Sequence, residues 1–141
     1  MLLSFKTELK PNNKQLTLFR KASGTARHAY NWACATVQNC LANNEKVPLA
    51  IDLHKWLVAE VKPIYKWYYD VSKTIPKKAV ADLRTAWDRC FKKTSKAPRF
   101  KKKGQRDSFY IESVTKAKPL IKNDGKRIKL RNRSEGLNLI I

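Results

Sequence analysis

Residues 13–43 read NKQLTLFRKASGTARHAYNWACATVQNCLAN, and this stretch decides what kind of fold the chain can form. Apolar side chains recur in it at intervals of three and four residues, which predicts amphipathic helices. Gly24-Thr25 interrupts the pattern and predicts a break between a helix over 13–23 and a second helix over 25–43. Two helices joined at a glycine have the outline of a helix-turn-helix, although any helical bundle can produce the same outline.

The segments on either side of this stretch predict one strand and two further helices. Alternation of apolar and polar residues predicts a strand over 2–9, and Pro11-Asn12-Asn13 ends it and offers a helix cap. Asp52 is placed to cap a third helix, which Pro63 interrupts. Pro76 is tolerated in a first helical turn and opens a long fourth helix. An aromatic cluster between these two helices, which we expect to be core rather than a base-stacking surface, consists of Trp67, Tyr68 and Tyr69.

From residue 92 the composition changes, because eight of the fifteen residues in 92–106 are Lys or Arg. This stretch predicts a basic loop, and the residues 108–114 that follow predict a strand. Asn123-Asp124-Gly125 lies between two apolar pairs and predicts the turn of a β-hairpin. The sequence therefore predicts a mainly α, α+β chain with an N-terminal strand, a four-helix lobe that starts like a helix-turn-helix, and a partial β-domain.

The charge of the chain points to an anionic partner. Lys and Arg number 31 against 11 Asp and Glu, a net charge of +20, and 16 of the basic residues lie in 92–141. Such a domain repels itself unless a polyanion neutralises it. Nucleic acid is the partner that we expect, because binding releases the counterions held on its phosphates. An anionic membrane surface or an acidic protein is the alternative.

Three groups of basic residues are predicted to contact phosphates. The first lies in the extended stretch around Pro98, whose alternative role is that of a solvated linker, and Phe100 beside it is expected to anchor in the core or stack on a base. The second lies at the start of the fourth helix, where outward N–H groups favour a phosphate. The third flanks Gly24, and ordinary exposed charges are its alternative. Together these groups comprise Arg20, Lys21, Arg27, Lys73, Lys77, Lys78, Arg99, Lys101, Lys102, Lys103 and Arg106.

Motifs of catalysis and of metal binding are absent from the sequence. It has no HExxH, GxSxG or Walker loop, and its three cysteines have no CxxC spacing. His28 and His54 stand alone and are expected to be structural. We therefore expect no enzyme activity, metal, cofactor or small-molecule substrate. The sequence also lacks a signal peptide and an 18-residue apolar run, which predicts a cytoplasmic protein without a membrane partner.

Three sequence motifs follow one another along the chain. They are the first strand with Pro11-Asn12 after it, GTARHAYNWA at 24–33, and APRFKKKG at 97–104 followed by Asp107-Ser108-Phe109. In order and spacing they resemble TnpB proteins, the OrfB-type RNA-guided nucleases encoded by transposons. The resemblance covers about residues 1–130. It implies a wedge β-domain that begins in 1–10, a helical recognition lobe over 11–95 with a transposase helix-turn-helix at 11–45, and a basic loop with the remaining wedge strands over 96–130.

The resemblance also carries functional expectations. In such proteins these parts hold the guide RNA scaffold and read a target-adjacent DNA motif, and by position Lys73, Lys77 and His54 lie near that duplex. The family continues into a RuvC-like nuclease with a metal site and a zinc element, and this sequence contains neither. Because residues 131–141 depart from the family pattern, we expect a divergent tail, as a frameshift would produce, and a chain truncated before the nuclease. The expected function is nucleic-acid binding without nuclease activity, and a stand-alone helix-turn-helix regulator of unknown oligomeric state is the alternative.

Overall fold

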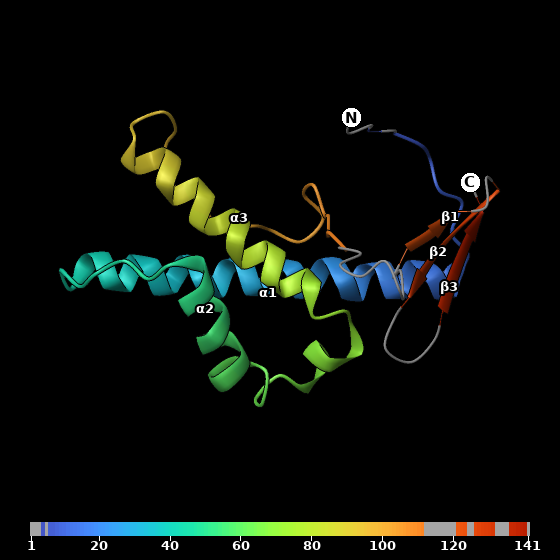
Figure 1. Cartoon of the computed structure of the whole chain (residues 1–141), viewed down its shortest axis with the longest axis horizontal. Helices are drawn as coiled ribbons and strands as arrows, with labels where there is room; N and C mark the ends of the chain where they lie inside the picture. The colour runs from blue at the N-terminus through green and yellow to red at the C-terminus, as the bar shows by residue number, and fades with distance from the viewer. Residues whose placement is uncertain (1–3, 5, 112–120, 124–125, 132–135, 141) are drawn as a thin grey trace.

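The fold, given by a computed structural model, is mainly helical, as predicted (Figure 1). The structure describes residues 4, 6–111, 121–123, 126–131 and 136–140. Its helices are α1 (Asn13–Ala42), α2 (Ala50–Trp56) and α3 (Thr74–Phe91), with a π-helical segment η1 (Leu57–Val61) that continues α2 and a 3-10 helix η2 (Lys66–Asp70) before α3. None of the helices in these ranges combines the length and the apolar character that crossing a bilayer requires.

Helix α1 runs without interruption through Gly24, so the predicted break between two helices is wrong. The hydroxyls of Ser23 and Thr25 donate to the carbonyl oxygens of Phe19 and Lys21, at 2.9 and 2.8 Å, and are thereby satisfied inside the helix. A glycine in a helix interior costs about 1 kcal/mol relative to alanine, and the packing of α1 against α3 offsets this cost. The first two helices of the expected four-helix lobe are therefore one.

The starts of the helices agree more closely with the sequence. Asn12 caps α1 in a capping box: its side chain accepts from the Gln15 N–H, and the Asn12 N–H donates to the Gln15 side chain, both at 2.9 Å. Asp52 lies inside the first turn of α2 rather than at its cap, and its carboxylate accepts from the Leu49 N–H at 3.3 Å. Pro76 lies in the first turn of α3, as predicted.

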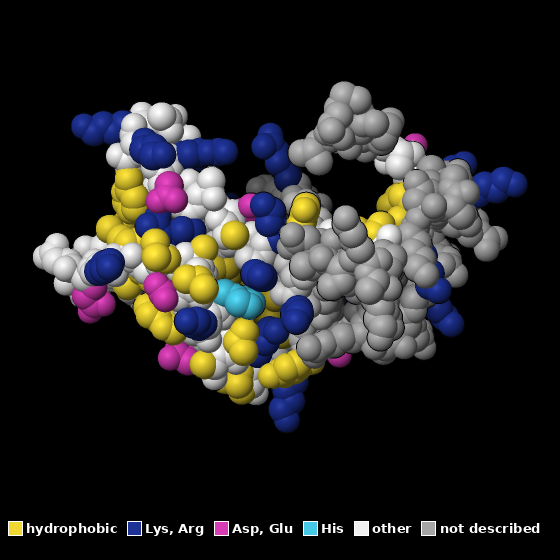
Figure 2. Space-filling model, in the orientation of Figure 1, with side chains coloured by type: hydrophobic (Ala, Val, Ile, Leu, Met, Phe, Trp, Pro, Cys, Tyr) yellow, Lys and Arg dark blue, Asp and Glu magenta, His cyan; other side chains and the backbone are white. Residues whose placement is uncertain are grey.

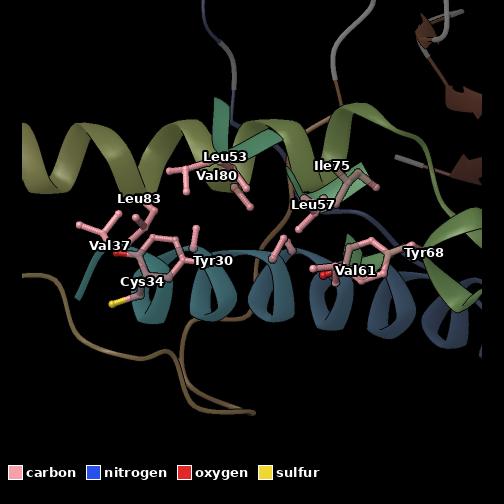
Figure 3. Packing of buried hydrophobic residues seen from close by; sticks show 14 of the residues in the cluster. Tyr30, Cys34, Val37, Leu53, Leu57, Val61, Tyr68, Ile75, Val80 and Leu83 are labelled. Carbon is pink, nitrogen blue, oxygen red and sulfur yellow. The ribbon is translucent and has the colours of Figure 1, made fainter. Parts of the chain in front are cut away.

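The hydrophobic core lies where α1, α3 and the α2–η1 segment meet (Figure 3). Alanines of α1, with Ala29 and Ala33 fully buried, let the other helices approach closely. Tyr68 of η2 is 1% exposed and closes one end of the core, so the expectation of a core residue is confirmed for this member of the aromatic cluster. The other large side chains that fill the core include Tyr30, Val37, Leu53, Leu57, Val61, Ile75, Val80 and Leu83.

A three-stranded antiparallel sheet in the order β1-β2-β3 follows the helices. Its strands are β1 (Ile121–Asn123), β2 (Arg127–Arg131) and β3 (Gly136–Ile140). The predicted hairpin is confirmed, since Ile121 pairs with Leu130; its turn residues 124–125 lie outside the described residues. Strand β3 lies in the stretch expected to be a divergent tail, and it pairs with β2.

Two predicted strands are wrong where the structure describes them. Residues 6–9 and 108–111 have no strand structure, while the rest of the predicted ranges 2–9 and 112–114 lies outside the described residues apart from residue 4, which also has none. In the second segment the apolar residues pack against the helices instead of extending a sheet: the rings of Phe109 and Phe19 lie 5.6 Å apart, and Phe109 and Ile111 pack against the core. Alternation thus identified the inward face of 108–111 correctly, but its partner is a helix; of residues 6–9, only Leu9 is partly buried.

Candidate nucleic-acid interface

Residues 98–107, which we call the basic strap, lie along α1 in the opposite direction. The Asn31 side chain holds the strap through the backbone of Lys101: Asn31 Nδ2 donates to the carbonyl oxygen at 3.0 Å, and the Lys101 N–H donates to Asn31 Oδ1 at 2.8 Å. One turn earlier in α1, Arg27 pairs with Asp107 at 3.3 Å, and Asp107 also accepts from the Gly104 N–H. The predicted loop therefore has a fixed path over the helix.

The basic side chains of the strap all lie at the surface of the protein. Lys101 has a partner within the chain, because its Nζ lies 4.2 Å from the centroid of the Tyr30 ring. Phe100 is 52% exposed, so it does not anchor the strap in the core. Of the predicted contacts, the strap carries Arg99, Lys101, Lys102, Lys103 and Arg106.

A hollow of about 400 Å³ opens on α1 next to the strap, and we call it the α1 hollow. It brings together the three basic residues that flank Gly24 in the sequence, and η2 contributes an aromatic wall. Its lining residues are Arg20, Lys21, Gly24, Thr25, Arg27, His28, Asn31 and Trp67. Because Arg27 and Asn31 also hold the strap, the hollow and the strap form one continuous surface along α1.

The charges of the α1 hollow are only weakly compensated. Lys21 lies 4.0 Å from Asp70, and both side chains are more than half exposed, so solvent screens this pair. Arg27 is the more buried cation, with 23% of its side chain exposed, and it has Asp107 as its partner. Arg20 is exposed. The hollow therefore presents two guanidinium groups and one ammonium group with carboxylates only at its edge.

The aromatic wall of the hollow is an ordered cluster. The rings of Trp67 and Tyr68 stack with centroids 4.6 Å apart at 15°, and the His28 ring meets Trp67 edge-on at 5.0 Å. His28 Nδ1 lies 2.6 Å from the Tyr68 hydroxyl. Burial lowers the pKa of His28 and raises the pKa of Tyr68, so both groups are held in their neutral forms and share this hydrogen bond. Trp67 is 39% exposed and Tyr69 44%, so the prediction that both are core residues is wrong.

A second basic cluster, which we call the His54 cluster, lies near the start of α3. Burial lowers the pKa of His54, and the positive charges of Lys62, Lys77 and Lys73 lower it further. The structure thus brings three residues predicted near the target-adjacent duplex into one electrostatic environment. Sequence analysis missed Lys62, which is 6% exposed. A single lysine at the end of a predicted helix looks like any surface lysine, so nothing in the sequence marks it as a buried member of this cluster. Tyr69 lies beside it, with its ring centroid 5.7 Å from Lys62 Nζ.

Lys78 has a different environment from its neighbours on α3. Its Nζ pairs with Asp82 at 3.0 Å and lies 5.3 Å from the centroid of the Tyr110 ring. It is also not among the charges that lower the pKa of His54. The predicted group at the start of α3 is therefore divided between two environments.

On the face in Figure 2, Lys and Arg side chains surround a histidine and far outnumber the acidic ones.

The metal sites that the family resemblance implies have no ligands in the part of the chain that the structure describes. No three His, Cys, Asp or Glu side chains come together there as a metal site requires. Cys34 and Cys40 are buried and Cys90 is half-buried, and all three carry free thiols. Neither a zinc element nor a divalent-metal site fits these residues.

Comparisons with known proteins agree with the three sequence motifs. Residues 1–46 match the helix-turn-helix domain model of the IS605 OrfB family. The chain is also 32% identical over 110 residues to InsQ of Escherichia coli (strain K12), which is described as an RNA-guided DNA endonuclease. That match covers 77% of this chain but 27% of the relative, so the chain spans about a quarter of the protein it resembles. Within the matched 46 residues, the structure forms the single helix α1 rather than two helices.

Proposed function

We propose that this chain binds nucleic acid through its basic surfaces, and the match of residues 1–46 to the helix-turn-helix domain model of the IS605 OrfB family supports this proposal. The observation that carries the proposal is that the α1 hollow and the basic strap share Arg27 and Asn31. Two groups of basic residues that are at least 72 positions apart in the sequence therefore act as one surface. A continuous basic surface is the electrostatic footprint of a protein that follows a phosphate backbone.

The strap and the hollow are proposed to hold the scaffold of a guide RNA. Apart from the half-buried Arg27, their Lys and Arg side chains are exposed, and those of the strap project from a backbone that α1 fixes in place. Contacts of this kind position a nucleic acid without reading its sequence, which suits a scaffold recognised by its shape. The relative InsQ is described as RNA-guided, which supports RNA as the ligand.

The His54 cluster is proposed to face the target-adjacent DNA. Lys73 and Lys77 lie at the first turn of α3, where the helix dipole adds positive potential. Lys62 lies close enough to add to this positive potential, since it lowers the pKa of His54 together with Lys73 and Lys77. A duplex phosphate there would offset the mutual repulsion of these charges, which supports the assignment.

The proposed role is binding, with no catalytic step assigned to the described residues. Acidic side chains are the groups that would hold catalytic metals, and several are instead engaged by cations. Salt bridges of this kind involve Asp70, Asp82, Asp88 and Asp107. The alternative of a stand-alone regulator requires a helix pair that meets at Gly24, and the uninterrupted α1 gives it no support.

The experiment is a binding titration of the purified chain against structured RNA, duplex DNA and anionic vesicles at a series of salt concentrations. We expect the chain to bind RNA and DNA, and the logarithm of the association constant should fall linearly with the logarithm of the salt concentration. Arg99→Gln, Lys102→Gln and Lys103→Gln should each lower the slope for RNA by about one. Lys46→Gln removes the same charge outside the basic surfaces and should change the slope less. Absence of polynucleotide binding at low salt, or preference for vesicles, would refute the proposal.

A further inference from the structure

We propose that the α1 hollow receives a single unpaired nucleotide of the bound strand, with its base stacked on Trp67 and its phosphate between Arg20 and Arg27. The inference rests on the proposed function, because it assigns one part of the basic surface to one chemical group. It goes further in requiring that the nucleic acid have an unstacked base at this point.

The size and lining of the hollow suit a nucleotide. Its volume of about 400 Å³ lies within the usual range for small-molecule sites. A nucleotide within a strand is a flat aromatic base joined through its sugar to negatively charged phosphodiesters, and the hollow offers one aromatic wall and three cations. A purely basic groove would lack the aromatic wall, and an apolar pocket would lack the cations.

Trp67 is built as a stacking platform. One face of its indole is stacked on Tyr68, which is 1% exposed, while 39% of Trp67 is open to solvent. His28 meets the Trp67 ring at its edge and also bonds to the Tyr68 hydroxyl, so the platform is held from two sides. A ring fixed in this way loses little conformational entropy when a base stacks on it.

The cations of the hollow are placed for a phosphate. A Cβ atom added to Gly24 would lie 3.6 Å from Nη2 of Arg27, so this guanidinium extends over the glycine in the hollow. Its other terminal nitrogen, Nη1, bonds to Asp107 and orients the group. Lys21 can turn from Asp70 to an incoming phosphate, because an exposed pair 4.0 Å apart is weak.

Gly24 supplies the floor of the hollow. Its backbone is helical and does not have a positive φ, which among the described glycines only Gly104 has. A Cβ atom added at Gly24 would be in ordinary van der Waals contact with its neighbours. Neither the backbone conformation nor a close approach therefore requires glycine at this position. What the glycine provides is space: a larger side chain here would project into the volume beside Trp67 and Arg27.

The polar groups of the hollow imply that the base is bound without regard to its identity. Asn31 uses both ends of its amide on the strap, and the Thr25 hydroxyl donates to the Lys21 carbonyl. Few groups remain to read the edge of a base. Stacking alone accepts any base, because every base has a π-face.

The test uses single-stranded oligonucleotides and hairpin duplexes that carry the fluorescent base 2-aminopurine, with RNA and DNA versions of each. Gly24→Leu fills the hollow, and Asn39→Leu adds the same side chain at an exposed position of the same helix. Trp67→Ala removes the platform, and Trp67→Phe keeps an aromatic face. Circular dichroism checks that each variant is folded, and leucine favours helix over glycine at position 24.

We expect quenching of 2-aminopurine in single strands, and about tenfold weaker single-strand binding by Gly24→Leu and Trp67→Ala. Duplex binding should change less than twofold, and Asn39→Leu and Trp67→Phe should stay close to the parent chain. Binding of either sugar supports the inference. Equal losses for single strands and duplexes, or no loss in either variant, would overturn it. If the parent chain bound no polynucleotide at all, the proposed function itself would fail, which is a distinguishable result.

Discussion

Asn31 and Lys101 are seventy residues apart, and the side-chain amide of the first pairs with the backbone of the second through two hydrogen bonds of 3.0 and 2.8 Å. The asparagine thus acts on the strap as a neighbouring β-strand would. Because the backbone of Lys101 is held, its side chain is free to lie over the Tyr30 ring at 4.2 Å. The path of the strap is therefore set by one amide on α1.

Replacing Asn31 should loosen the strap without unfolding the helices. Asn31→Ala removes both hydrogen bonds, each worth about 1 kcal/mol, so the free energy of unfolding should fall by about 1–2 kcal/mol. Urea denaturation measures this change, and amide hydrogen exchange at Lys101 should accelerate. Asn39→Ala, at an exposed position on the same helix, should change both quantities much less. An unaltered exchange rate at the Lys101 amide would contradict the claim that Asn31 holds the strap.

Removing the carboxylate of Asp107 should strengthen nucleic-acid binding. Asp107→Asn frees Arg27 and removes a negative charge from the strap, so affinity at low salt should rise about twofold to fivefold. The folded state should lose about 1 kcal/mol or less, because the pair is only partly buried and solvent screens it. Asp88→Asn makes the same charge change beside Arg84, away from the strap. If both variants gained equally in an RNA titration, net charge alone would explain the gain.

The half-buried imidazole of His54 should make stability depend on pH. Its pKa is lowered in the folded state, chiefly by burial and then by Lys62, Lys77 and Lys73, so the unfolded chain binds more protons as pH falls below about 6.5. The free energy of unfolding should therefore be greater at pH 7.5 than at pH 5.5. Urea denaturation at the two pH values measures the difference, and it should shrink in His54→Gln.

The same histidine reports on its lysine neighbours. Lys73→Gln or Lys77→Gln removes a positive charge that lowers the pKa of His54, so the pKa should rise in an NMR titration. Lys66→Gln is the matched control, because Lys66 is not among the charges that act on this imidazole. Bound duplex DNA should also raise the pKa if its phosphates approach the cluster. An unchanged pKa in both lysine variants would place the lysines elsewhere.

Gly24→Ala distinguishes the observed helix from the turn that the sequence predicted. Alanine in a helix interior is favoured over glycine, so the melting temperature should rise, with a gain of up to about 1 kcal/mol. A turn with a positive φ at this position would give the opposite sign. A calorimetric melt of the two chains therefore decides between the two descriptions of residues 13–43.

The starts of α1 and α3 were predictable because their signals are local. Asn12 with Gln15 and Pro76 in a first turn identify helix starts from a few adjacent residues. Gly24 misled for a physical reason: glycine weakens a helix by an amount that the burial of Ala22, Ala26, Ala29 and Ala33 can outweigh. Whether that burial occurs depends on α3, fifty residues further along the chain.

The candidate site was predictable in composition but not in arrangement. The basic residues beside Gly24 and those after Pro98 are visible in the sequence, yet nothing there joins them. Their union depends on the Asn31 amide and on Arg27, whose partners lie far away in the chain. Trp67 was expected to be core because aromatic clusters generally are, but the structure leaves 39% of it exposed while Tyr68, stacked on it, is buried.

The continuity of α1 also gives its two halves a fixed rotational phase. Thirty residues in one α-helix extend about 45 Å, and each residue advances the helix by about 100°. Arg20 and Lys21 precede Gly24, Arg27 and Asn31 follow it, and all four line the same hollow only because no hinge separates them. A single residue inserted at this point would turn one pair away from the other by more than a quarter of a revolution, dismantling the hollow while leaving every one of its side chains in place.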